Sequence, residues 1–121
     1  MRIGPTLAVT MFLASGLSAC AAKSPAAFTD ADRAEVSSTI ASFTNAVRNN
    51  DFATAASWYV EDGVIMPPNA PAVKGRAGIQ KGFEGFGHVD AFSQPVVEID
   101  GVGDLAYARV NYDVTFTPAK A

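Results

Sequence analysis

The chain changes from helical to extended patterning within residues 58–68, which read WYVEDGVIMPP. The apolar run at residues 64–66 is short and is stopped by two consecutive prolines, Pro67 and Pro68. A proline has no backbone N–H, so this segment cannot pair with another strand along its full length. We therefore expect a short strand here, a turn at residues 69–71 and a short returning strand at residues 72–74.

Two helices are predicted before this stretch. Thr29 is placed to cap the first helix, with Asp32 three residues further on, and Asn49-Asn50 ends it. Apolar residues at helical spacing form one stripe on it: Val36, Ile40, Phe43 and Val47. Asp51 can cap a second, short helix, whose apolar face comprises Phe52, Ala55, Ala56 and Tyr59. Because the connection is so short, the two helices must pack as a corner or hairpin.

A third helix and then β-structure are predicted after this stretch. Gly75-Arg76 opens the helix, which has Ile79, Phe83 and Phe86 on one face. Residues 96–99 then lead through a turn at 100–104 into the longest predicted strand, residues 105–116. Its apolar positions alternate with polar ones, so one face is expected to meet a core or pocket and the other solvent or a partner.

The N-terminus resembles the export signal of a bacterial lipoprotein. A short basic start and an apolar stretch precede Leu17-Ser18-Ala19-Cys20, which resembles a lipobox. We expect residues 1–19 to be a signal peptide, Cys20 to be lipidated, and residues 20–28 to form a tether. The alternatives are an ordinary signal peptide, or a buried helix, with an incidental cysteine. Residue 21 is Ala rather than Asp, which by resemblance to Gram-negative sorting favours the outer membrane.

The rest of the composition is that of one small domain. About 100 residues remain after the signal, enough for a single hydrophobic core. The net charge is −3 and the basic residues are scattered, which argues against nucleic acid as a partner. The chain has a single cysteine, so no intramolecular disulfide can form.

The order of these elements resembles the nuclear transport factor 2-like fold, over roughly residues 30–117. The resemblance is to its SnoaL-like and ketosteroid-isomerase-like branch. It is carried by AVRNND at 46–51, WYVEDGVIMPP at 58–68, VKGRAGI at 73–79 and DLAY at 104–107. It implies an α+β cone, in which helices pack on a curved antiparallel sheet.

Domains of this family usually finish with two more long strands, whereas this sequence stops at residues 117–121. We therefore expect residues 29–121 to be an incomplete domain of this fold. A fragment, a shortened reading frame and strands supplied by a partner all remain open. Such a domain is expected to be poorly stable and to pair through the exposed edge of its long strand.

The resemblance also implies catalytic positions. The tyrosine position of the isomerase branch corresponds to Phe43 and the base position to Pro67, while the late-strand acid would lie beyond Ala121. None of these catalytic residues is present, which speaks against that reaction. His88, the only histidine, is a weak candidate proton-transfer residue in a predicted loop, with a solvated loop histidine as the alternative.

Three acidic residues are explained more simply by their positions in turns than by a catalytic or metal-binding role. Asp62 occupies a position that the family often fills with Asp, and here it is expected to stabilise the turn into the short strands. Asp100 and Asp104 are only two carboxylates without further ligands at calcium-loop spacing. We expect them to lie in a solvated turn, and we predict neither a metal nor a cofactor.

A pocket is the remaining functional feature of the sequence. Aromatic and apolar residues are expected to line the mouth of a cone, with the alternative that they fill a small core: Phe43, Trp58, Tyr59, Met66, Phe83, Phe86 and Tyr112. We predict a noncatalytic, small-molecule-binding or accessory domain on a lipid anchor. The alternatives are an isomerase- or cyclase-like enzyme acting on an apolar substrate, and an assembly module that dimerises through its sheet.

Overall fold

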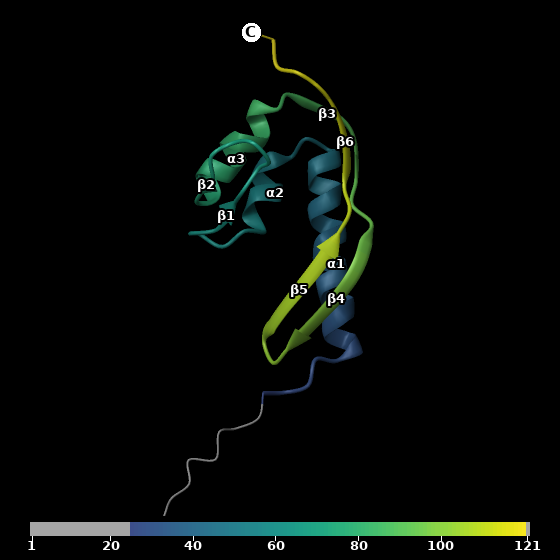
Figure 1. Cartoon of the computed structure of the whole chain (residues 1–121). Coiled ribbons are helices and arrows are strands. Elements are labelled where there is room, and N and C mark those ends of the chain that lie inside the picture. Colours follow the sequence, from purple (N-terminus) through teal and green to yellow (C-terminus); the bar gives the residue numbers. More distant parts are fainter. Residues whose placement is uncertain (1–24, 121) are drawn as a thin grey trace, which may run out of the picture.

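The computed structural model describes residues 25–120, which form three helices packed against one long, bent β-hairpin (Figure 1). The predicted signal peptide and Cys20 lie outside these residues. The helices are α1 (Asp30–Arg48), α2 (Phe52–Ser57) and α3 (Arg76–Gly85). The strands are β1 (Val64–Ile65), β2 (Val73–Lys74), β3 (His88–Ser93), β4 (Val96–Val102), β5 (Leu105–Val110) and β6 (Asp113–Thr117).

The start of α1 is fixed by the capping box that the sequence predicts. The Thr29 hydroxyl oxygen accepts a hydrogen bond from the Asp32 backbone N–H at 3.2 Å. In return, the Asp32 carboxylate accepts one from the Thr29 backbone N–H at 2.7 Å. The Asp32 carboxylate also accepts a hydrogen bond from the Thr29 hydroxyl at 2.6 Å. This bond and the one from the Thr29 N–H hold the pKa of Asp32 below its ordinary value, because both favour the charged carboxylate.

The two halves of the hairpin continue one register. Strand β3 pairs with β6 and β4 with β5, both antiparallel, and the pairs Ser93↔Asp113 and Val96↔Val110 lie in line. The Asn111 backbone N–H donates to the Pro95 carbonyl at 3.1 Å across the gap between them. The predicted strand at residues 105–116 is therefore wrong in one respect: it is divided at residues 111–112. Pro95 opposite has no N–H to contribute to a continuous ladder.

The predicted alternation of faces along this segment is confirmed. Val114 lies opposite Phe92, and Phe116 opposite the buried Val89, so these side chains share the face that meets the helices. On the other face Arg109 and Tyr107 both bind the Glu98 carboxylate, the tyrosine hydroxyl at 2.6 Å. The hairpin thus has one apolar inner face and one polar outer face.

The corner between α1 and α2 is joined to the hairpin by Asn50. Its backbone has a φ of 57°, a left-handed conformation that asparagine tolerates better than most residues. Its side-chain amide donates to the Val89 carbonyl at 3.0 Å and accepts from the Val89 N–H at 2.6 Å. The amide therefore takes the place of a neighbouring strand on the helical side of β3.

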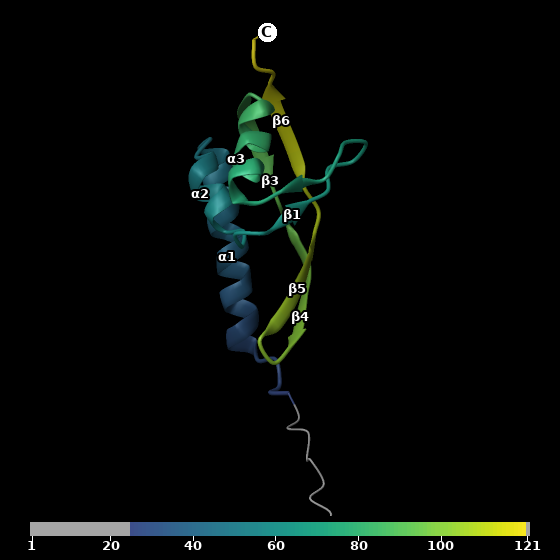
Figure 2. The ribbon, with the colours of Figure 1, turned by 90° about the vertical axis from the view of Figure 1, so that its left-hand side faces the viewer.

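The residues before α1 contact the far end of the hairpin, where Figure 2 shows them beside the β4–β5 turn. The Gly103 N–H donates to the Ala26 carbonyl at 2.8 Å. A side chain at Gly101 would come within 2.7 Å of the Phe28 ring, so only glycine fits there. The second half of the predicted tether is thus packed against the domain in the structure.

Few residues are fully buried, and the inner face of the hairpin is covered only in part. The most buried apolar side chains come from all three helices and β3: Ala46, Val47, Ala55, Ala56, Ile79 and Val89. Leu105 and Phe116 remain substantially exposed. Among residues 25–120, β5 and β6 have no strand paired along their outer edge. None of the helices in this range is long and apolar enough to cross a membrane.

We predict that Asn50→Ala destabilises the protein by about 1–3 kcal/mol more than Asn69→Ala, as measured by urea denaturation. Both asparagines have a positive φ, at 57° and 58°, so both variants carry the same backbone strain. Only Asn50→Ala also leaves the buried N–H and C=O of Val89 without partners. Equal losses for the two variants would show that the side-chain bonds to β3 contribute nothing.

Candidate functional site

A cavity of about 850 Å³ lies between the helices, the β1–β2 arm and the inner face of β3 and β6. Six of the seven residues that the sequence predicts for a pocket line it: Phe43, Tyr59, Met66, Phe83, Phe86 and Tyr112. They come from five different segments of the chain, so the cavity exists only in the folded domain. Its volume falls within the usual range for small-molecule sites.

The wall of the cavity is a connected set of aromatic rings. The Phe43 ring centroid lies 6.1 Å from that of Tyr59, 6.2 Å from Phe83 and 6.4 Å from Phe92. Phe83 is also 6.2 Å from Phe52, which extends the set onto α2. Tilted and edge-on rings at these distances are favourable arrangements. The rings pack around a space rather than closing it.

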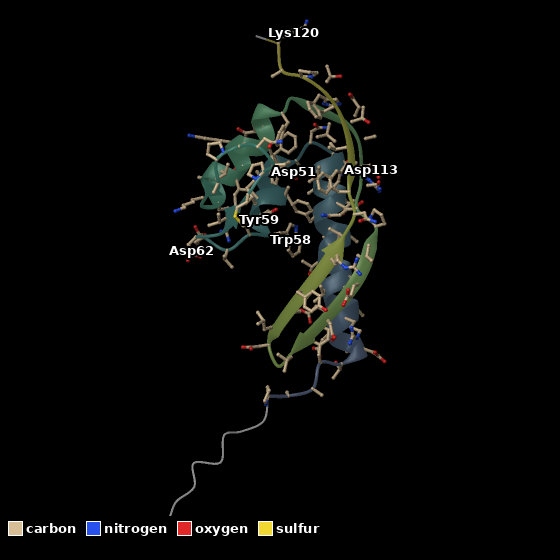
Figure 3. The ribbon with its side chains drawn as sticks, in the orientation of Figure 1. Asp51, Trp58, Tyr59, Asp62, Asp113 and Lys120 are labelled. Atoms are coloured by element: carbon tan, nitrogen blue, oxygen red, sulfur yellow. The ribbon has the colours of Figure 1, made fainter. Side chains whose placement is uncertain are left out.

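Trp58 is the exception among the predicted pocket residues. It follows the last residue of α2, is 47% exposed and does not line the cavity. Tyr59, one residue further on, shares the apolar face of Phe52 and Ala55, and each residue along a helix turns by about 100°. Figure 3 labels both side chains beside α2. The pocket prediction is therefore wrong for Trp58.

Three aromatic residues of the cavity were not predicted as pocket residues: Phe52, Phe92 and Phe116. Phe52 and Phe116 lie on the apolar faces that the sequence pattern assigns to α2 and to the long strand. Phe92 lies in β3, a strand that the sequence analysis did not predict. The segment lacks the strict alternation that identifies a strand, because the register shift between Val89 and Ala91 separates the two inner-face residues Val89 and Phe92 by three positions.

The polar groups in the cavity wall are few and uncharged. Burial raises the pKa of the Tyr59 hydroxyl, which therefore stays protonated at neutral pH. Tyr112 lies at the rim, where it is 59% exposed. Gln94 adds a carboxamide from the bend between β3 and β4. None of the lining residues in the described part of the chain carries a formal charge.

Arg76 holds Tyr59 and the β1–β2 arm in place. Its guanidinium donates to the Tyr59 carbonyl oxygen at 3.0 and 2.7 Å and forms an ion pair with Glu61. The neighbouring Gly75 has a φ of 75° and donates its N–H to the Gly63 carbonyl at 2.7 Å. These contacts position the arm so that its apolar residues close one side of the cavity.

His88 lies outside this cavity. It begins β3 rather than lying in a loop, because it pairs with Thr117, and its side chain is 66% exposed. Its Nε2 atom is 3.9 Å from an Asp90 carboxylate oxygen. The prediction of a loop is thus wrong. The histidine faces solvent, away from the aromatic wall.

The acidic residues also lie away from the cavity. Asp62 is exposed on the side of the arm that faces away from the hairpin (Figure 3). Asp100 forms an ion pair with Arg33 at 2.9 Å and accepts from the Gly101 N–H at the same distance. Both bonds lower its pKa. Residues 25–120 contain no cluster of three or more potential metal ligands.

Two positions that the sequence resemblance assigns to catalytic groups of the isomerase branch lie in the cavity wall. Phe43 and Pro67 both line it. At these two positions the cavity wall has a phenyl ring and a pyrrolidine ring. Neither ring can donate or accept a proton.

A model of a known protein family agrees with this architecture. The family model described as a SnoaL-like domain matches residues 40–121. A solved structure of ActVI-ORFA from Streptomyces coelicolor is similar, with 22% identity and a TM-score of 0.44, over 68% of this chain and 82% of that one. A search of curated proteins finds no match. Because the family model covers more than half of the chain, the protein belongs to the SnoaL-like domain family, with the nuclear transport factor 2-like α+β fold.

Proposed function

We propose that this protein binds a neutral, largely apolar small molecule in the aromatic cavity, without transforming it, while anchored to a membrane by lipid on Cys20. The observation that carries the binding proposal is the composition of the cavity wall. It combines a volume of about 850 Å³ with rings from three helices and two strands and with only neutral polar groups. Sites for small molecules are typically apolar with a few polar groups that set orientation.

A neutral ligand fits this wall better than a charged one. A carboxylate or ammonium moved into an apolar site without a partner of opposite sign loses its hydration at high cost. The cavity offers such a group only phenolic hydroxyls and one carboxamide. Flat aromatic or alicyclic ring systems, in contrast, can stack on Phe43, Phe83 and Phe92.

The distribution of titratable groups supports binding over isomerase- or cyclase-like chemistry. General acid–base catalysis needs a group that exchanges a proton near the working pH and lies within hydrogen-bond reach of the ligand. The titratable residues that line the cavity are Tyr59 and Tyr112, and burial moves the pKa of Tyr59 further from neutrality. His88 and Asp90 face solvent.

The lipid anchor is supported by the sequence around Cys20. The only cysteine follows an apolar stretch and small residues at the position that a lipobox requires. Two or more acyl chains hold a protein firmly on a membrane, whereas a single chain binds marginally. We therefore propose export and anchoring, with the outer membrane as the destination in a Gram-negative cell.

We predict that Gly82→Leu weakens binding of pyrene, a neutral fluorescent hydrocarbon, by at least about tenfold relative to the unmodified full-length chain. Gly82 lies on α3 and lines the cavity, and the nearest side-chain atom to an added Cβ is 4.0 Å away. A leucine can therefore be accommodated there and fills space that the ligand needs. Fluorescence titration measures the dissociation constants.

Gly85→Leu is the matched control. It lies on the same helix, does not line the cavity and has nothing within 4 Å of an added Cβ. Both variants replace a helical glycine and so gain a similar helix propensity, worth less than about 1 kcal/mol. Equal pyrene affinity in the two variants would contradict the proposed site. Turnover of a model ketosteroid that is abolished by His88→Ala would favour the alternative function, an isomerase- or cyclase-like enzyme.

We predict that labelled palmitate enters the wild-type protein in a bacterial host and does not enter Cys20→Ala. Thiol acylation by the lipoprotein pathway requires this cysteine, which is the only one in the chain. Ser18→Ala keeps a small residue two positions before the cysteine and should label normally. Label retained in Cys20→Ala, or absent from both Ser18→Ala and the wild type, would contradict the anchor.

A further inference from the structure

Gln94 occupies a boundary between two hollows of the protein. It lies in the bend between β3 and β4. Figure 1 shows these two strands beside α1. Gln94 lines both the aromatic cavity and a smaller groove of about 430 Å³ between α1 and the strands. Among the described residues it is the only one that lines both.

The contact between Gln94 and Thr44 determines which way the carboxamide faces. The Thr44 hydroxyl lies 2.8 Å from the Ile40 carbonyl oxygen and 3.2 Å from the Gln94 amide atom drawn as Oε1. A hydroxyl has one proton, and both of these neighbours are drawn as acceptors. A glutamine amide can turn either its oxygen or its nitrogen toward such a neighbour, and the surrounding hydrogen bonds decide which.

The distances favour the opposite orientation of the amide. O–H···O bonds are usually about 2.7–2.8 Å long, which fits the bond from Thr44 to Ile40. A separation of 3.2 Å is long for such a bond but within the range of N–H···O bonds. The amide nitrogen of Gln94 therefore donates to the Thr44 hydroxyl oxygen. The Thr44 hydroxyl then donates to the Ile40 carbonyl oxygen and accepts from the Gln94 amide nitrogen.

This orientation leaves the amide oxygen free. The second amide atom of Gln94 forms no hydrogen bond to the described residues, and no buried polar side-chain atom of residues 25–120 lacks a partner. The free atom is thus accessible, and it belongs to a residue that lines the aromatic cavity. With the nitrogen on Thr44, that accessible atom is an acceptor.

We propose that Gln94 selects ligands that carry a hydroxyl group, by accepting a hydrogen bond from it with Oε1. Thr44 acts as a positioning residue, because it holds the amide nitrogen and does not line the aromatic cavity. The inference rests on the proposed function, since it names a property of the ligand that the cavity takes. The ligand class is a neutral ring system with a hydroxyl donor at one end.

The test compares three neutral probes on the full-length chain: pyrene, 1-hydroxypyrene and 1-acetylpyrene. They share one ring system. Pyrene has no hydrogen-bonding group, 1-hydroxypyrene has a hydrogen-bond donor, and 1-acetylpyrene has only an acceptor. Wild-type protein should bind hydroxypyrene more tightly than pyrene, and Gln94→Leu should reduce that ratio by about 2- to 10-fold, the range given by one net hydrogen bond. Thr44→Val should reduce the same ratio while leaving pyrene binding within about twofold, because only the amide loses its orientation.

Two results would overturn the inference about Gln94 while leaving the proposed function in place. One is binding of pyrene with a hydroxypyrene preference that Gln94→Leu leaves unchanged. The other is a Gln94-dependent preference for acetylpyrene, which would place the amide nitrogen toward the cavity. Failure of all three probes to bind, or equal pyrene binding by Gly82→Leu and Gly85→Leu, would overturn the proposed function and this inference with it.

Discussion

The structure depends on the pair of hydrogen bonds between the Asn50 side chain and the backbone of Val89. Strand β3 is paired on one side with β6, and the asparagine amide occupies the helical side at the one buried residue of that strand. Without it, the N–H and C=O of Val89 would be buried and unpaired on that side. The free energy lost would be a large part of the small net stability of such a domain. This contact joins the α1–α2 corner to one position along β3. It thereby sets the distance between the helices and the hairpin on either side of the cavity.

The aromatic residues then form a wall because few large side chains are available to fill the space between the layers. The fully buried apolar positions of the helical layer are mostly small, as at Ala46, Ala55 and Ala56. The rings of Phe43, Phe83 and Phe92 contact one another in tilted pairs and leave the centre open. Arg76 keeps the arm against this opening through the Tyr59 carbonyl. A loosely filled interior of this kind is suited to taking up an apolar molecule.

Local features were predictable from the sequence, and long-range ones were not. The capping box of Thr29 and Asp32, the stripe on α1 and the alternation along residues 105–116 all depend on neighbours within a few positions. Asn50 could be recognised only as a helix end, because its partner Val89 is 39 residues away. The bend at Pro95 and the strand that begins at His88 also required the register of the folded hairpin. Gln94 had no distinguishing sequence signal, since its role arises from a contact with Thr44 on a different element.

The central claim is that a neutral ring system binds between the helices and the inner face of the hairpin. The most direct measurement is an NMR experiment on the isotope-labelled full-length chain with bound pyrene, in which intermolecular nuclear Overhauser effects identify the contacting side chains. The account predicts contacts to the rings of Phe43, Phe83 and Phe92. Contacts confined to exposed residues of the hairpin, such as Leu105 and Tyr107, would contradict it.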